Sequence, residues 1–133
     1  LEDLRHMAAQ FGVDGFVVKT AQIDQPADGH PLLTRDPNLR RYDRSPEGRW
    51  TLRNPLLDQC WRMWQGAVIT WDGQVVPCCF DKDAQHVMGS LKEERMVDIW
   101  HNERYKRFRS TLFAGRTDIP MCTNCSEGSH VYA

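Results

Sequence analysis

The sequence predicts an α+β fold in which a β-hairpin is followed by helices around a site of four cysteines. The hairpin is indicated by residues 68–76, where an Asp-Gly dipeptide separates two runs of β-forming residues and predicts a two-residue type I′ turn. Apolar residues at three- and four-residue steps between positions 90 and 112 indicate the helices. The third observation is the set of cysteines around these elements: Cys60, Cys78, Cys122 and Cys125.

Two helices are expected after the hairpin. The first should begin at Ser90, because Ser90 and Glu93 match a capping box, and its apolar face comprises Met96, Val97 and Trp100. The second should be capped by Asn102, and its apolar stripe comprises Tyr105, Phe108 and Leu112. Pro120 should stop any helix and deliver an extended chain into Cys122.

Three segments are expected along the chain. Residues 1–23 read as a helix that ends at Gly12, followed by a short buried strand at 16–18, which together form the last αβ unit of an upstream α/β barrel. Residues 24–58 are polar and rich in proline, as in a connector. Residues 59–133 carry the cysteines and form the last domain. Since the chain starts at Leu1 rather than at methionine, we expect a fragment of a longer protein.

Charge and composition exclude some classes of binding partner. Seventeen basic and eighteen acidic residues leave a formal net charge of −1, so no overall field attracts nucleic acid or an anionic membrane. No apolar run approaches the roughly 20 residues of a membrane-spanning helix, and no signal peptide is evident. The expected compartment is therefore the cytoplasm, where thiols stay reduced. There the five cysteines indicate metal ligands rather than disulfides.

The cysteines divide into two pairs and a spare. Cys122 and Cys125 form a CxxC, whose spacing lets two thiolates bind one metal centre from a tight turn. Cys60 and Cys78 flank the hairpin, which can return them to the same end of the domain. Neighbouring side chains of an extended strand point to opposite faces, so Cys78 and Cys79 are not expected to bind the same centre. Cys79 is expected to be a small buried residue or a neighbour of the ligands, and at most a substitute for Cys78.

These residues resemble the SPASM/twitch region of radical S-adenosylmethionine (SAM) enzymes over residues 60 to about 128. The resemblance rests on Cys60, the GxxxxC that ends at Cys78, and the CxxC. It also includes Gly89-Ser90-Leu91, Asp98-Ile99-Trp100 and Tyr105. It implies an auxiliary [4Fe–4S] cluster held by Cys60, Cys78, Cys122 and Cys125, carboxyl-terminal to a partial (β/α)6 barrel. Residues 1–23 resemble the last repeat of that barrel.

Two departures from the family pattern limit what this chain can do. No cysteine follows Cys125, which fits the shorter twitch type with one auxiliary cluster. The CxxxCxxC that binds the SAM-cleaving cluster is absent, so the chain is not expected to be catalytic by itself. The resemblance places SAM and a second [4Fe–4S] cluster in the full-length parent only.

Three functions are consistent with this pattern. Four thiolates leave no open iron position, so the cluster would relay or accept electrons in an oxidoreductase or in an enzyme that modifies a peptide or small molecule. Its partners would then be the upstream barrel, that substrate and an electron-transfer protein. A structural Cys₄ zinc module is the first alternative. The second is a substrate-recognition domain without a redox role, with candidate residues Arg104, Arg107 and Arg109 on an exposed helix face.

Overall fold

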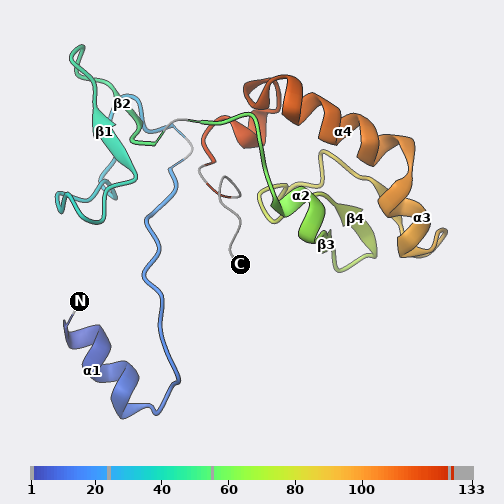
Figure 1. The fold of residues 1–133 in the computed structure, drawn as a ribbon. Coiled ribbons are helices and arrows are strands. Elements are labelled where there is room, and N and C mark those ends of the chain that lie inside the picture. Colours follow the sequence, from blue (N-terminus) through green and yellow to red (C-terminus); the bar gives the residue numbers. More distant parts are fainter. Residues whose placement is uncertain (1, 24, 55, 126, 128–133) are drawn as a thin grey trace. The chain divides into compact units, whose positions relative to one another are not determined.

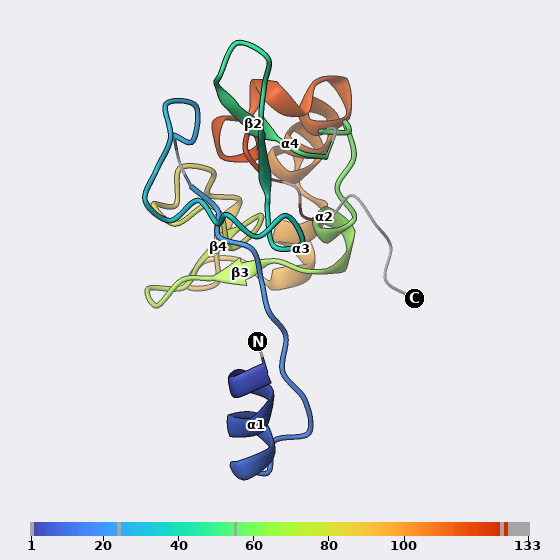
Figure 2. The same ribbon diagram turned by 90° about the vertical axis from the view of Figure 1, so that its left-hand side faces the viewer.

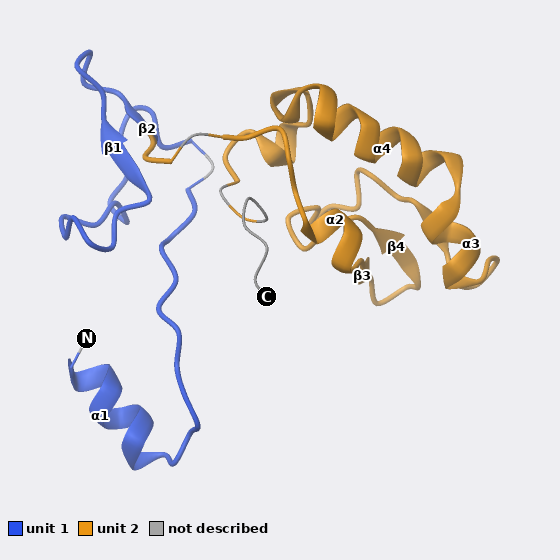
Figure 3. Ribbon diagram, in the orientation of Figure 1, with its two compact units in different colours: residues 1–51 blue, residues 52–133 orange. Residues whose placement is uncertain are grey.

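The computed structural model describes residues 2–23, 25–54, 56–125 and 127. The chain divides into two compact units, residues 1–51 and 52–133, which are coloured separately in Figure 3. Figure 1 gives the order of the helices and strands along the chain. Each unit is described here by itself.

Unit 1 begins with helix α1 (Glu2–Gln10). The helix ends as predicted: Gly12 adopts φ of 65°, and the amide of Val13 donates to the carbonyl of Ala8 at 3.3 Å. Residues 16–18 form no strand within the described part of the chain, and Val17 is 82% exposed. The prediction places the partner strands in an upstream barrel, so this αβ unit stays a prediction. An apolar run becomes a strand only when another backbone accepts and donates its hydrogen bonds.

The rest of unit 1 contains a short two-stranded sheet inside the predicted connector. Strands β1 (Tyr42–Arg44) and β2 (Trp50–Leu52) pair with each other. Tyr42 is only 2% exposed. Its hydroxyl accepts from the Ile23 amide at 3.0 Å and donates to the Ile23 carbonyl at 3.3 Å. A buried tyrosine thus joins two segments 19 residues apart.

Unit 2 contains the remaining elements. They are α2 (Arg62–Gln65), β3 (Val68–Ile69), β4 (Gln74–Val76), β5 (Gly89–Ser90), α3 (Met96–His101), α4 (Glu103–Ala114) and the 3₁₀ turns η1 (Arg116–Asp118) and η2 (Pro120–Cys122). In both Figure 1 and Figure 2, α4 lies on one side of the unit and β3 and β4 on the other. The core between them is built from Met63, Val75, Met88, Ile99, Tyr105, Phe108, Leu112 and Ile119, together with Cys60 and Cys122.

The hairpin is confirmed, with a different turn. Strands β3 and β4 are antiparallel, with Val68 opposite Val76 and Ile69 opposite Val75. The loop has three residues rather than two, because the amide of Thr70 still donates to the carbonyl of Gln74 at 2.9 Å. Type I′ requires positive φ at both central residues, but here only Gly73 has it, at 86°. The Asp72 carboxylate favours this loop by accepting hydrogen bonds from the side chains that flank it.

The capping box at Ser90 is wrong. Ser90 belongs to β5, which pairs with β4 in an antiparallel arrangement, and α3 begins only at Met96. A third strand fits here because Gly89 lacks a side chain, whose Cβ would lie 2.8 Å from Ile99. The predicted apolar face of α3 needs correction as well. Ile99 is fully buried, whereas Val97 is 53% exposed.

Helix α4 follows the prediction. The side chain of Asn102 accepts the amide of Tyr105 at 2.9 Å and donates to the carbonyl of Met88 at 2.8 Å. The predicted stripe of Tyr105, Phe108 and Leu112 is buried. Pro120 does not deliver an extended chain, however. It occupies the first position of the 3₁₀ turn that ends at Cys122, where its missing amide costs nothing.

Replacing Asn102 by alanine is expected to lower the free energy of unfolding by about 1–2 kcal/mol, because the helix loses its cap and Met88 loses a donor. Asn102→Asp is the matched control. It keeps the acceptor for the Tyr105 amide but also loses the donor to Met88, so it should lose less stability than Asn102→Ala. Urea denaturation of the metal-free chain measures both changes, and equal losses in the two variants would contradict a capping role.

None of the described helices has the length and apolar character needed to cross a membrane.

Candidate metal centre

The four predicted cysteines lie at the ends of separate elements of unit 2. Cys60 comes just before α2, and its carbonyl accepts the amide of Met63 at 3.2 Å. Cys78 follows β4, while Cys122 ends η2. The amide of Cys125 donates to the carbonyl of Cys122 at 3.2 Å, so the CxxC forms a tight turn. All four thiols are free.

Their burial is similar. Cys60, Cys122 and Cys125 are 8%, 7% and 5% exposed, and Cys78 is half-buried against the same core. Cysteines that serve as metal ligands need this protection, since water competes for the metal and hydrolyses metal–sulfur clusters. The hairpin and the turns of the chain therefore shield the thiols from solvent.

The thiols also influence one another electrostatically. Burial raises the pKa of Cys122 to about 12, Arg116 opposes that rise, and Cys78, Cys125 and Cys60 add to it. Burial likewise raises the pKa of Cys78 to about 11, with smaller contributions that include Cys125. Cys122 is therefore near the other three thiols of the set. At neutral pH these two thiols stay protonated without metal, so metal binding must release their protons.

Cys79 differs from the other four cysteines in burial, although its thiol also contributes to the raised pKa of Cys78. It is exposed, which corrects the expectation of a buried spare, and it follows Cys78 in a turn rather than in a strand. The amide of Asp81 donates to the carbonyl of Cys78 at 3.1 Å and closes this turn. Of the two neighbours, Cys78 is the one packed against the core.

Among the described residues, no group of three or more His, Cys, Asp or Glu side chains lies close enough together to hold a metal ion. The structure therefore does not bring the four predicted thiols together as a formed metal site.

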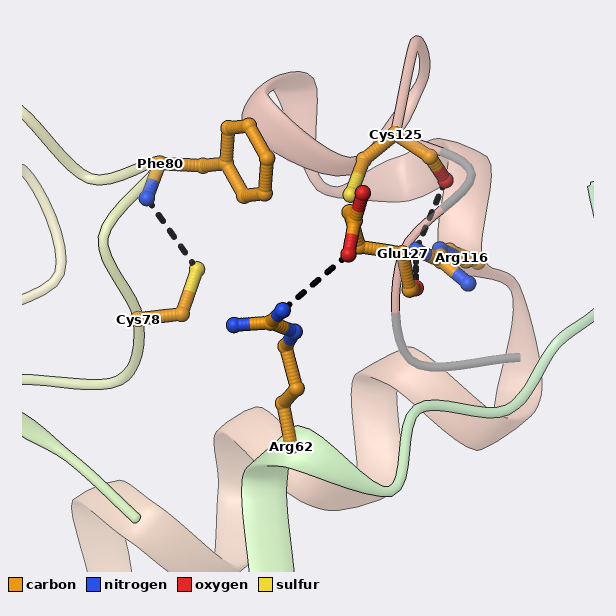
Figure 4. A network of polar contacts seen from close by, with 6 residues as sticks. All are labelled: Arg62, Cys78, Phe80, Arg116, Cys125 and Glu127. Carbon is orange, nitrogen blue, oxygen red and sulfur yellow. Dashed lines mark hydrogen bonds and ion pairs between the residues drawn. The ribbon is translucent and has the colours of Figure 1, made fainter. Parts of the chain in front are cut away.

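Figure 4 shows polar contacts near two of the cysteines, Cys78 and Cys125. The amide of Phe80 donates to Sγ of Cys78 at 3.4 Å, a contact typical of metal-bound thiolates. Asp81 is 6% exposed and holds the following loop by accepting the amides of Gln85 and His86, each at 2.9 Å. The loop after Cys78 is thus held by hydrogen bonds at Phe80 and at Asp81.

Arg116 connects the two ends of the cysteine set. Its side chain is 1% exposed and donates to the carbonyls of Gln59 at 2.9 Å, Cys125 at 2.7 Å and Glu127 at 2.8 Å. Its own amide donates to Asp58 at 2.6 Å. The guanidinium therefore joins the segment just before Cys60 to the CxxC loop, and it places a positive charge near Cys122.

Arg62 lies nearby but has a different environment. Its guanidinium donates to the Glu127 carboxylate at 3.0 Å, and its side chain is 43% exposed. Sequence reasoning missed both Arg62 and Arg116. Nothing in their spacing marks them, because each acts on residues about sixty positions away.

The arrangement defines a small cysteine-rich domain suited to a metal–sulfur centre. A comparison with protein families matches residues 60–126 to SPASM, an iron–sulfur cluster-binding domain. The match begins at Cys60, extends just past Cys125 and covers half of the chain. The chain therefore belongs to the SPASM family, which confirms the resemblance found in the sequence.

Two curated proteins are similar over the same part of the chain. One is the S-adenosyl-L-methionine-dependent 2-deoxy-scyllo-inosamine dehydrogenase of Niallia circulans, 41% identical over 64 residues, which cover 47% of this chain and 26% of that protein. The other is the tungsten-containing aldehyde ferredoxin oxidoreductase cofactor-modifying protein of Pyrococcus furiosus. It is 36% identical over 73 residues, which cover 45% of this chain and 20% of that protein. The matched segments thus span about a quarter of these relatives or less.

A solved structure is also similar: the crystal structure of selenomethionine BtrN in an open conformation. It is 37% identical, with a TM-score of 0.47, and the match covers 52% of this chain and 33% of that chain.

Proposed function

We propose that Cys60, Cys78, Cys122 and Cys125 hold one auxiliary [4Fe–4S] cluster that relays or accepts electrons. The observation that carries the proposal is that Cys60 and Cys122 share one buried core, with Cys78 packed against it, inside the segment that matches the SPASM family. The donor set fits the cluster, because the thiols are free and shielded and an amide already donates to one sulfur. When bound, the cluster supplies one-electron chemistry.

Complete ligation supports a relay rather than a substrate site. Four protein thiolates occupy every iron corner, so a substrate finds no vacant coordination position. The residues of this chain then have three tasks: the cysteines bind, Phe80 donates to sulfur, and the core excludes water. These residues would hold a fully ligated cluster, and the chemistry that it would supply is one-electron transfer without direct binding of the substrate.

The parent protein is proposed to be a radical SAM enzyme, either an oxidoreductase or an enzyme that modifies a small molecule or peptide. Similarity to a SAM-dependent dehydrogenase and to a cofactor-modifying protein supports this class. In this proposal, residues 1–23 belong to the end of a barrel, 24–58 connect it to the cluster domain, and 59–133 form that domain. The barrel carries the CxxxCxxC, a second cluster and SAM.

Anaerobic reconstitution followed by redox titration tests the relay. We expect iron and sulfide in the ratio of one [4Fe–4S] cluster per chain, and a reversible one-electron transition in the optical and electron paramagnetic resonance spectra. A loaded cluster without an accessible potential would leave only a structural role. A colourless protein with one zinc per chain would instead support the zinc module and contradict the cluster.

A further inference from the structure

Arg109 is not on an exposed face, as the sequence suggested, but inside a cage of three aromatic rings. It is 7% exposed, and its guanidinium carbon lies 4.5 Å from the ring centroids of Trp64 and Trp100 and 4.4 Å from that of Tyr105. It donates to the carbonyls of Met63 at 3.1 Å and Trp100 at 3.0 Å. Cation–π contacts and hydrogen bonds therefore fix this arginine, and with it the ring of Tyr105.

Tyr105 carries a buried hydroxyl without a partner in the described part of the chain. Its side chain is fully buried, yet its oxygen makes no hydrogen bond to any described residue. An unsatisfied buried hydroxyl typically costs about 1–3 kcal/mol. Phenylalanine would fill the same space without this cost, so the hydroxyl needs an acceptor that the protein atoms do not provide.

The cysteines supply the candidate acceptor. Tyr105 belongs to the core cluster that contains Cys60 and Cys122, and Cys78 packs against the same cluster. Its hydroxyl is also close enough to Cys78 for the two groups to interact electrostatically. A phenol hydroxyl is protonated at neutral pH and can act as a donor. Arg109 makes it a better donor, because a cation over the ring draws electron density from the oxygen.

We infer that the hydroxyl of Tyr105, fixed in place by Arg109, donates a hydrogen bond to a sulfur on the Cys78 side of the cluster. The inference rests on the cluster proposed above. A hydrogen bond to sulfur stabilises the more negative, reduced cluster more than the oxidised one. Tyr105 is therefore a positioning residue that raises the reduction potential, and it does not react.

The test compares two conservative variants of the full chain. Tyr105→Phe removes a hydroxyl that has no described partner, whereas Tyr42→Phe removes the buried hydroxyl of unit 1 that makes two hydrogen bonds to Ile23. We expect Tyr105→Phe to lower the equilibrium constant for reduction by up to about tenfold, which is about 59 mV for one electron. Its metal-free stability should not fall. Tyr42→Phe should show the opposite pattern, with lower stability and an unchanged potential.

Further measurements separate this inference from the relay. Resonance Raman spectroscopy of the oxidised cluster should show shifted iron–sulfur stretching bands in Tyr105→Phe, whether or not the cluster can be reduced. If wild type has a measurable potential, but potential and bands are unchanged in Tyr105→Phe, the inference fails and the relay stands. If the wild-type cluster has no accessible reduction potential, the relay proposal fails, and only the Raman bands test the hydrogen bond from Tyr105.

A second variant covers the case in which Tyr105→Phe does not fold or bind the cluster. Incorporation of 3-fluorotyrosine at Tyr105 keeps the ring and strengthens the hydroxyl as a donor. It should move the potential upward, or shift the same bands in the opposite direction. No change with this substitution would overturn the inference.

Discussion

Replacing Cys122 by serine is expected to abolish cluster binding and to remove most of the stability of unit 2. Cys122 interacts electrostatically with Cys60, Cys78 and Cys125, so its loss opens the proposed cage at its most connected corner. The strands of this unit are only two or three residues long, and such a small unit relies on a bound centre to hold its elements together. Iron and sulfide content should fall to background, and the denaturation midpoint should approach that of the metal-free chain.

Cys79→Ser is the matched control for this experiment. Cys79 is exposed and lies next to Cys78 in the chain, so the same chemical change should leave cluster content and stability unaltered. Comparison with Cys78→Ser then decides which neighbour is the ligand. If Cys79→Ser lost the cluster and Cys78→Ser retained it, the proposed ligand set would be wrong at that corner.

Replacing Arg116 by methionine is expected to destabilise the chain by more than about 3 kcal/mol. The substitution removes the donors of three carbonyls, those of Gln59, Cys125 and Glu127, inside a site that water does not reach. It also releases the CxxC loop from the segment before Cys60. Guanidinium chloride would add charge screening, so urea denaturation with iron analysis is the better measurement.

Two variants show whether the position or the charge of Arg116 matters. Arg62→Met makes the same change at a half-exposed ion pair close to the site and should cost about 1 kcal/mol or less. Arg116→Lys keeps the charge but lacks the forked donors that reach several carbonyls at once. We expect it to be nearly as unstable as Arg116→Met. If Arg116→Lys kept full stability, the charge rather than the hydrogen-bonding geometry would be the main contribution.

Local sequence patterns predicted the elements whose stabilising contacts are themselves local. Asn102 lies three residues from the amide it caps, and Gly73 lies within the loop that it closes. The CxxC likewise forms its turn from four consecutive residues. Such features follow from backbone conformation and short-range hydrogen bonds, which a stretch of sequence contains in full.

The wrong predictions concern residues whose structure depends on contacts with distant parts of the chain. Ser90 has the local pattern of a helix cap, but β4 offers it strand hydrogen bonds from a segment sixteen residues away. Arg109 looks like one more basic residue on a helix surface, although three rings bury it. In each case a distant contact decides the outcome.

By itself the sequence determined the family, the hairpin and the helix that follows Asn102, since each depends on residue types at fixed spacings. The tertiary structure decided which polar side chains lie around the thiols. Arg116 reaches Gln59 across 57 positions, and Tyr105 approaches Cys78 across 27. Burial and proximity arise from packing between distant segments, so the contacts of these two residues became visible only in the folded chain.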